Sequence, residues 1–106
     1  MATGRLGHAD LAAGAYTSLY TVPANTNAIV SVNMVNRGYS AITIRIATTT
    51  GATPLASEFI EYDVELLSKG VMERTGIALS AGQILVVYSS AVSVSAVCFG
   101  IETSTV

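Results

Sequence analysis

Apolar and polar residues alternate with a period of two over several short stretches of this chain. The clearest alternation lies at residues 41–48, where Ile42, Ile44 and Ile46 are separated by polar residues. Because successive side chains of a β-strand point to opposite faces, such a stretch predicts a strand with one buried face. A helix would place these isoleucines on different faces, so the pattern favours strands.

Turn signals divide the alternating stretches from one another. Pro, Gly and Asn stand between them, and these residues favour the backbone angles of tight turns. In the fourth stretch, the side chains expected on the buried face are those of Ile60, Tyr62, Val64 and Leu66. The predicted strands span residues 16–22, 28–35, 41–48, 58–66, 71–75, 83–89 and 92–101.

Seven or eight short strands at this spacing predict an all-β fold, a single-domain antiparallel β-sandwich that is jelly-roll-like. Residues 1–14 are small and weakly patterned, and they predict an N-terminal arm with a short helical turn around 10–13. The sandwich domain then spans 15–106. Within it, we expect 76–82 to be a connector and 102–106 a polar tail.

A long stretch without charge raises the question of a membrane span. No charged residue lies between Arg74 and Glu102, and about 20 apolar residues suffice to cross a bilayer. However, five serines and Gln83 interrupt this stretch, 81–83 predicts a turn, and 92–96 alternates with period two. We therefore expect strands and no membrane partner. The N-terminal residues also lack the apolar core of a signal peptide.

The chain is poor in charge. Of 106 residues, 51% are apolar and 11% are charged, against about 25% charged in a typical soluble domain. The net charge of −2 gives no basic excess, so we expect no nucleic-acid partner. One cysteine is too few for a disulfide-stapled domain, and the apolar content is too high for a disordered chain.

The low charge predicts an interface. The outer faces of the expected strands still carry apolar residues, and large exposed apolar patches usually mark interaction sites. We expect another subunit, or a loop of the same chain, to cover part of them. The residues concerned are Ile29, Val35, Phe59, Val86 and either Val97 or Cys98.

Candidates for catalytic chemistry are few. His8 lies near Asp10, but the chain offers only generic hydroxyls and Cys98 as nucleophiles. Cys98 lies in an apolar strand, where burial disfavours the reactive thiolate. We therefore expect no enzyme, no catalytic residues and no cofactor.

Acidic residues cluster between positions 58 and 65. Glu61, Asp63 and Glu65 share one face of the expected strand, with the outer two about 13 Å apart at 3.3 Å per residue. That spread is too wide for a single catalytic pair or metal site. We expect a solvated or interfacial stripe, paired with Arg45 or Arg74 on a neighbouring strand.

Several segments resemble small virion proteins of tailed phages, among them capsid decoration (cement) proteins and tail- or fibre-associated β modules. The resemblance covers most of the chain and rests on β patterns. The segments are 4–7, 10–12, 19–24 (LYTVPA), 35–38 (VNRG), 42–47 (ITIRIA), 73–77, 79–83, 84–90 and 97–102.

The resemblance implies a non-enzymatic structural protein of the virion. Its expected role is to bind and stabilise a phage capsid shell as a decoration protein, made in the host cytoplasm and located on the capsid surface. The implied partner is the major capsid protein, and cement proteins are often trimers. The arm, with Leu6, His8 and Leu11, would form the docking element, and Phe59 is a further candidate interface residue.

Two alternatives remain open. The chain resembles tail, neck or fibre-associated subunits as well as head proteins. A carbohydrate-binding β module is the other possibility, because Tyr39 or Tyr16 could stack on a sugar ring.

Overall fold

The computed structural model describes residues 2–51 and 53–105. In this part of the chain there are eight strands and one short 3₁₀ helix. The elements are β1 (Thr3–Asp10), β2 (Ala15–Thr21), β3 (Thr26–Asn36), β4 (Ile42–Thr49), η1 (Ala56–Glu58), β5 (Phe59–Leu66), β6 (Val71–Leu79), β7 (Ile84–Ser89) and β8 (Val94–Ser104).

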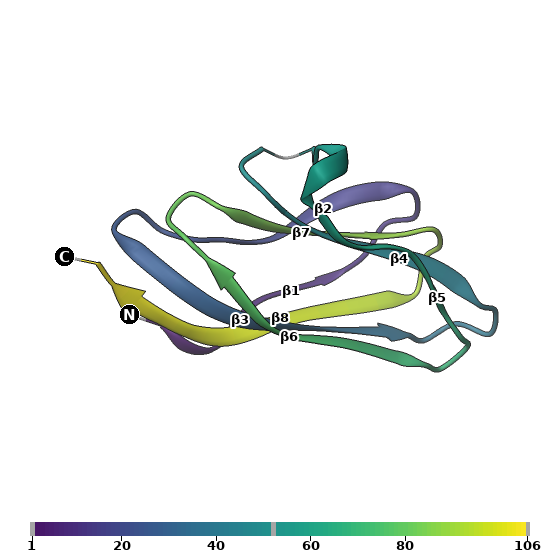
Figure 1. The fold of residues 1–106 in the computed structure, drawn as a ribbon. Coiled ribbons are helices and arrows are strands. Elements are labelled where there is room, and N and C mark those ends of the chain that lie inside the picture. Colours follow the sequence, from purple (N-terminus) through teal and green to yellow (C-terminus); the bar gives the residue numbers. More distant parts are fainter. Residues whose placement is uncertain (1, 52, 106) are drawn as a thin grey trace.

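The strands form two stacked four-stranded sheets (Figure 1). Sheet A has the order β1-β8-β3-β6, and sheet B has the order β2-β7-β4-β5. All pairs between neighbouring strands are antiparallel. The first strand pairs with the last, the second with the seventh, the third with the sixth and the fourth with the fifth, which is a jelly-roll arrangement. The predicted β-sandwich class is thus confirmed.

The core lies between the sheets and follows the alternation of the sequence. Along β3 the buried side chains occupy every second position from Ala28 to Met34, and along β4 they are Ile42, Ile44 and Ile46. Leu85 and Val87 of β7 face them from the neighbouring strand. The predicted buried faces of these strands are confirmed.

The predicted N-terminal arm is wrong for Thr3–Asp10, which forms strand β1 along one edge of β8. Leu6 packs against the core, and Leu11 is buried in it. Gly7 is small because the chain passes close to β2: an added Cβ would lie 2.1 Å from the carbonyl oxygen of Leu19. Gly7, one of the small residues that suggested a loose arm, is therefore required by close packing. The helical turn expected at 10–13 is also absent.

Two strands are longer than predicted. β6 continues through the expected connector to Leu79, with a bulge at Gly76, whose φ is +70°. The bulge lets Ile77 and Leu79 point into the core, as the sequence predicted for these two side chains. β8 continues to Ser104, so most of the expected polar tail is a strand paired with β3.

Tyr62 was expected on the buried face of its strand, and this is wrong. Asp63 has a φ of +51°, and the pairing of β5 with β4 shifts at this point. The bulge reverses the alternation locally, so Tyr62 lies on the outer face and is 57% exposed.

The chain covers the outer face of sheet B with its own residues. The segment 53–58, which includes η1, lies over this face in Figure 1. Ala47, Thr49 and Val86, whose side chains share this outer side, are about 1% exposed. Val86 is therefore buried by a loop of the same chain, one of the two possibilities that the sequence left open.

The uncharged stretch between Arg74 and Glu102 forms the end of β6, all of β7 and most of β8. Of the described residues, none belongs to a helix with the length and apolar character needed to cross a membrane.

Candidate docking surface

Four loops gather at one end of the sandwich, on the right in Figure 1. They are 11–14, 37–41, 67–70 and 90–93, which join β1 to β2, β3 to β4, β5 to β6 and β7 to β8. We call this end the loop tip. The jelly-roll connectivity brings together loops that are far apart in the sequence.

The loop tip exposes large apolar side chains. Tyr39 is 89% exposed, Leu67 62% and Val92 63%, each from a different loop. Tyr39 has the highest exposure of the large apolar residues that the structure describes. An exposed apolar side chain contributes most to the free energy of binding a protein when its loop is already ordered, because little conformational entropy is then lost on binding.

A buried amide orders two of these loops. The side chain of Asn36, at the end of β3, is 1% exposed. Its Nδ2 donates to the carbonyl oxygens of Ser40, Leu66 and Leu67 at 2.8, 3.1 and 3.2 Å. Its Oδ1 accepts a hydrogen bond from the backbone N–H of Gly38 at 2.9 Å. The amide thus holds the loop 37–41 against the loop at the end of β5.

Further contacts brace the loop tip. The backbone N–H of Arg37 donates to the carbonyl of Ser93 at 2.8 Å, and its guanidinium pairs with Asp10. Lys69 Nζ donates to the carbonyl oxygen of Arg37 at 2.7 Å and lies 4.1 Å from the centre of the Tyr39 ring. All four loops are therefore linked, since Asp10 immediately precedes the loop 11–14.

Backbone strain is also present at the loop tip. Lys69 has a φ of +61° and Ser93 a φ of +67°, angles that residues with a side chain rarely adopt. Such conformations persist only where surrounding contacts hold them, and they often accompany binding sites. The hydrogen bonds from the Arg37 N–H to the Ser93 carbonyl and from Lys69 Nζ to the Arg37 carbonyl supply those contacts.

The structure does not bring the four predicted interface residues together. Leu11 is buried in the core, and Leu6 is half-buried and packs against it. His8 is exposed on the outer face of sheet A, where it pairs in register with Val97. Phe59 is half-buried on the outer face of sheet B.

The sequence pattern does not single out the loop tip as a site. The chain reverses direction at 37–41, between β3 and β4. Tyr39, within this reversal, was the available signal, because an aromatic residue in a short loop has few places to be buried. The partnership between this loop and the loops 67–70 and 90–93 depends on the tertiary fold.

Phe59 belongs to a cluster of rings around Arg45. The rings of Tyr62 and Tyr88 lie 4.4 and 4.5 Å from the guanidinium carbon. Arg45 Nε donates to Asp63 at 2.6 Å, and this hydrogen bond is the main cause that raises the pKa of Arg45. Phe59 meets the Tyr62 ring edge-on at 4.9 Å. The cluster packs the outer face of sheet B, and Arg45 is already engaged within the chain.

Asp63 and Glu61 pair with Arg45 and Arg74, the two arginines that the sequence singled out. The predicted common face of the acidic residues is wrong, because the bulge at Asp63 sets Glu61 opposite the inward-facing Ile46, whereas Glu65 lies opposite Thr43. Besides the Arg45–Asp63 pair, Arg74 Nη1 lies 2.7 Å from Glu61 Oε2 and so connects β6 of one sheet with β5 of the other. The described residues contain no group of three or more side chains suited to hold a metal ion.

Cys98 and His8 face opposite sides of sheet A. Cys98 points into the core, and burial raises the pKa of its thiol to about 11. The thiol is therefore protonated near neutral pH and is shielded from solvent. His8 lies on the outer face, so the two side chains form no nucleophile–base pair.

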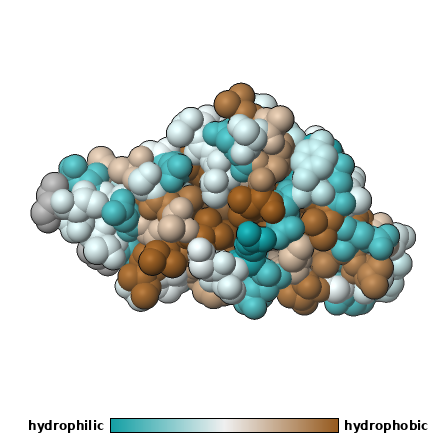
Figure 2. All heavy atoms as spheres, in the orientation of Figure 1, coloured by the Kyte–Doolittle hydropathy of each residue, from teal (hydrophilic) through white to brown (hydrophobic). Residues whose placement is uncertain are grey.

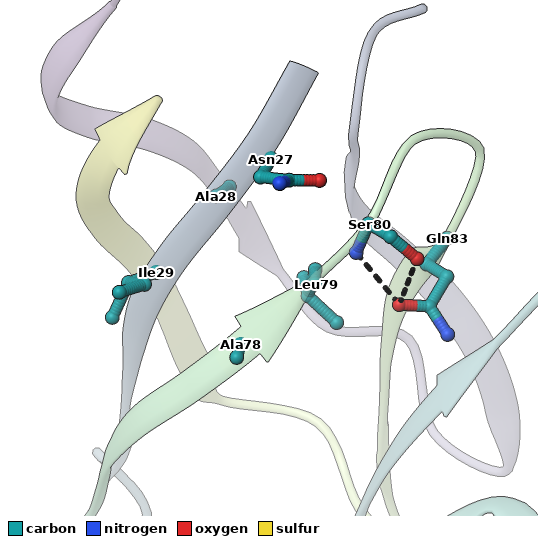
Figure 3. A pocket seen from close by; sticks show the side chains of 7 residues that line it. All are labelled: Asn27, Ala28, Ile29, Ala78, Leu79, Ser80 and Gln83. Carbon is teal, nitrogen blue, oxygen red and sulfur yellow. Dashed lines mark hydrogen bonds between the residues drawn. The ribbon is translucent and has the colours of Figure 1, made fainter. Parts of the chain in front are cut away.

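A shallow hollow lies beside the end of sheet A (Figure 3). Gln83 Oε1 accepts hydrogen bonds from the backbone N–H and the hydroxyl of Ser80 at 2.8 and 3.2 Å, which closes the β6–β7 turn. None of its lining residues is charged, and the Gln83 carbonyl is used within the chain. The lining residues are Asn27, Ala28, Ile29, Ala78, Leu79, Ser80 and Gln83.

No protein-family model, curated protein or solved structure matches this chain. The loop tip, with exposed apolar side chains on braced loops, is the surface best suited to bind another protein.

Proposed function

We propose that this protein is a non-enzymatic virion protein that binds and stabilises a phage capsid shell as a decoration protein. Two general observations support this: jelly rolls are common in viral capsid domains, and the sequence resembles small virion proteins of tailed phages. The observation that carries the proposal is the loop tip, where Tyr39 and Leu67 are exposed on loops ordered by Asn36 and Val92 is exposed on a loop held by the hydrogen bond from Arg37 to Ser93.

The loop tip has the properties of a protein-binding centre. Tyrosine is enriched among the residues that dominate interface energies, and its ring has little conformational freedom to lose. Lys69 and Arg37 surround the apolar centre with charge, as in the polar rim of an interface. The loop tip would seat on the major capsid protein, with Tyr39 in an apolar pocket.

The test uses tailed-phage capsids assembled without this protein, and isolated tails alongside them. Purified protein is mixed with each, and binding is measured by co-sedimentation. We expect the wild-type chain to bind capsids, and the double variant Tyr39→Ala/Leu67→Ser to bind at least about 100-fold more weakly, since two central contacts are lost.

Leu55→Ser is the matched control, because Leu55 is 66% exposed but lies on the segment over sheet B. It should bind as the wild type does. Wild-type binding to tails alone would favour a tail, neck or fibre subunit. Equal capsid binding by the double variant would remove the loop tip from the proposal.

Carbohydrate binding is a second candidate function. Its support is the Tyr39 ring, which is 89% exposed and has a cation at 4.1 Å. A glycan array probed with wild-type protein and with Tyr39→Ala tests it. Glycan binding that disappears in the variant, together with no capsid binding, would favour this function over the first.

A further inference from the structure

The outer side of sheet A is uncovered. No described segment lies over it in Figure 1, in contrast to the outer side of sheet B. We call this surface the open face. Ile29 is 62% exposed, Ile101 56% and Val71 59%, and Ile29 and Ile101 are directly opposite each other on β3 and β8. Figure 2 shows apolar surface on the lower flank of the molecule, at the side of sheet A.

The centre of the open face carries no charge. Its ten outward positions on the two central strands are apolar, hydroxyl or amide residues. Asn33 Oδ1 is buried and has no hydrogen-bond partner among the described residues. The ten residues are Asn27, Ile29, Ser31, Asn33, Val35, Ser95, Val97, Phe99, Ile101 and Thr103.

Opposite charges lie at the two edges of the open face. Arg5 and His8 are exposed on β1, and Glu73 is exposed on β6. His8 pairs with Val97, Val97 with Asn33, and Asn33 with Glu73. The row from His8 to Glu73 therefore crosses an uncharged centre, and Arg5, the cation of this edge, lies two β8 positions along from His8.

We propose that a second copy of this chain packs on the open face, related by a two-fold axis parallel to the strands. This axis lays β1 of each copy over β6 of the other, so the row of His8 faces the row of Glu73 of the second copy, and Arg5 lies two β8 positions along from that row. An axis across the strands would instead set β1 against β1 and β6 against β6, which leaves Arg5 and Glu73 at opposite edges of the interface. Asp10, the remaining charge of β1 on this side, is engaged by Arg37.

The size of the open face suits a reversible dimer. Four strands about 4.8 Å apart and about nine residues long at 3.3 Å each give a face of roughly 19 by 30 Å. Packing two such faces would bury on the order of 1,200 Å² in total, at the lower end of stable interfaces.

This symmetry has a consequence for docking. An axis parallel to the strands places both loop tips at the same end of the dimer. Two tips that bind together gain about 10²- to 10⁴-fold in apparent affinity through effective concentration. This consequence rests on the proposed function, whereas the dimer itself does not.

The dimer is tested by light scattering on the purified chain at about 1 to 200 μM. We expect a mass that rises toward twice the 10.9 kDa of one chain. Ile29→Glu should weaken association at least about 100-fold, because it places a charge in the apolar centre. Leu55→Glu, an equally exposed position away from the open face, should associate as the wild type does. A monomer at all concentrations, or the trimer that the family resemblance implies, would overturn the proposal.

A charge exchange tests the direction of the axis. Glu73→Arg should weaken the dimer about tenfold or more, and adding Arg5→Glu should restore it. Circular dichroism confirms that each variant is folded. If Glu73→Arg leaves association unchanged, this axis is wrong.

Failure of the dimer and failure of shell binding can be told apart. Tyr39→Ala/Leu67→Ser should remain dimeric while losing capsid binding. Ile29→Glu should keep single-site capsid binding and lose only the gain from bivalency.

Discussion

At the residue scale, two asparagines of β3 differ in their contribution to stability, because one forms hydrogen bonds with its surroundings and the other leaves a buried oxygen without one. Asn36 is fully satisfied, with three carbonyl acceptors and one N–H donor. Asn33, on the open face, has a buried Oδ1 without a partner among the described residues. Asn36 therefore stabilises the fold and orders two loops of the loop tip, whereas the Oδ1 of Asn33 is withdrawn from water without a hydrogen bond from the described residues, which costs stability.

Asn36→Ala should lower the free energy of unfolding by about 2–4 kcal/mol, because it leaves buried carbonyls unpaired and removes several hydrogen bonds at once. Urea denaturation measures this loss. Asn27→Ala, at an exposed position of the same strand, should change stability by less than about 0.5 kcal/mol. A loss for Asn36→Ala no larger than that of the control would contradict the role assigned to this amide.

A second residue-scale interaction links the last strand to β2. Tyr20 Oη donates to Glu102 Oε2 at 2.5 Å, and the backbone N–H of Ala2 donates to Glu102 Oε1 at 3.1 Å. The hydrogen bond from Tyr20 is the main cause that lowers the pKa of Glu102. Burial first, and then the same hydrogen bond, raise the pKa of Tyr20 well above its ordinary value.

Because the pKa of Glu102 is lowered in the folded protein, the free energy of unfolding depends on pH in the acidic range. The stabilising contribution is present above the unfolded pKa, about 4.3, and is lost as the pH falls through the lower folded pKa. Tyr20→Phe should therefore show a smaller fall in Tm between about pH 5 and pH 2 than the wild type. Tyr39→Phe, at an exposed tyrosine, should keep the wild-type slope. Equal slopes for Tyr20→Phe and the wild type would rule out this linkage.

At the element scale, close backbone approach and bulges shape the strands more than side-chain patterning does. Gly76 and Asp63 each turn the chain through a positive φ, and each changes which side chains face the core. Gly100 has a different role, because an added Cβ would lie 2.2 Å from the carbonyl oxygen of Ile29 on the neighbouring strand. The contact between β8 and β3 at this point leaves no room for a side chain.

Gly100→Ala should destabilise the protein by about 2–3 kcal/mol, because the backbone of β3 or β8 must move to admit the methyl group. Thermal unfolding followed by circular dichroism measures the effect. Gly51→Ala is the matched control, since open space surrounds that position and its φ is not in the positive region. The prediction fails if the two variants melt at the same temperature.

At the scale of the whole molecule, the N-terminal strand is part of the closed sandwich and not an appendage. β1 pairs with β8 along seven positions from Thr3 to Asp10, and Leu6 packs against the core. Removing β1 would expose one edge of β8 and open the core beside it.

A chain without residues 2–10 should lose its cooperative thermal transition, because β8 and the core lose a strand of contacts. A chain with two glycines inserted between Thr50 and Gly51, in an exposed loop, should keep that transition. Both are measured by circular dichroism. A cooperative transition near the wild-type Tm in the truncated chain would support a detachable arm instead.

Local sequence patterns were enough to predict the strands β2 to β8, the buried faces of β3 and β4, the sandwich class and the shortage of charge. These follow from alternation between neighbouring positions, which each segment carries locally. Tertiary structure decided the rest. Gly7 and the residues around it form a strand because β8 offers a free edge about 90 positions away. Val86 is buried on the outer side of sheet B, over which the segment 53–58 lies, and Tyr62 is exposed because a bulge reverses its strand. The loop tip likewise exists only once the jelly roll brings four distant loops to one end, where the amide of Asn36 can hold two of them together.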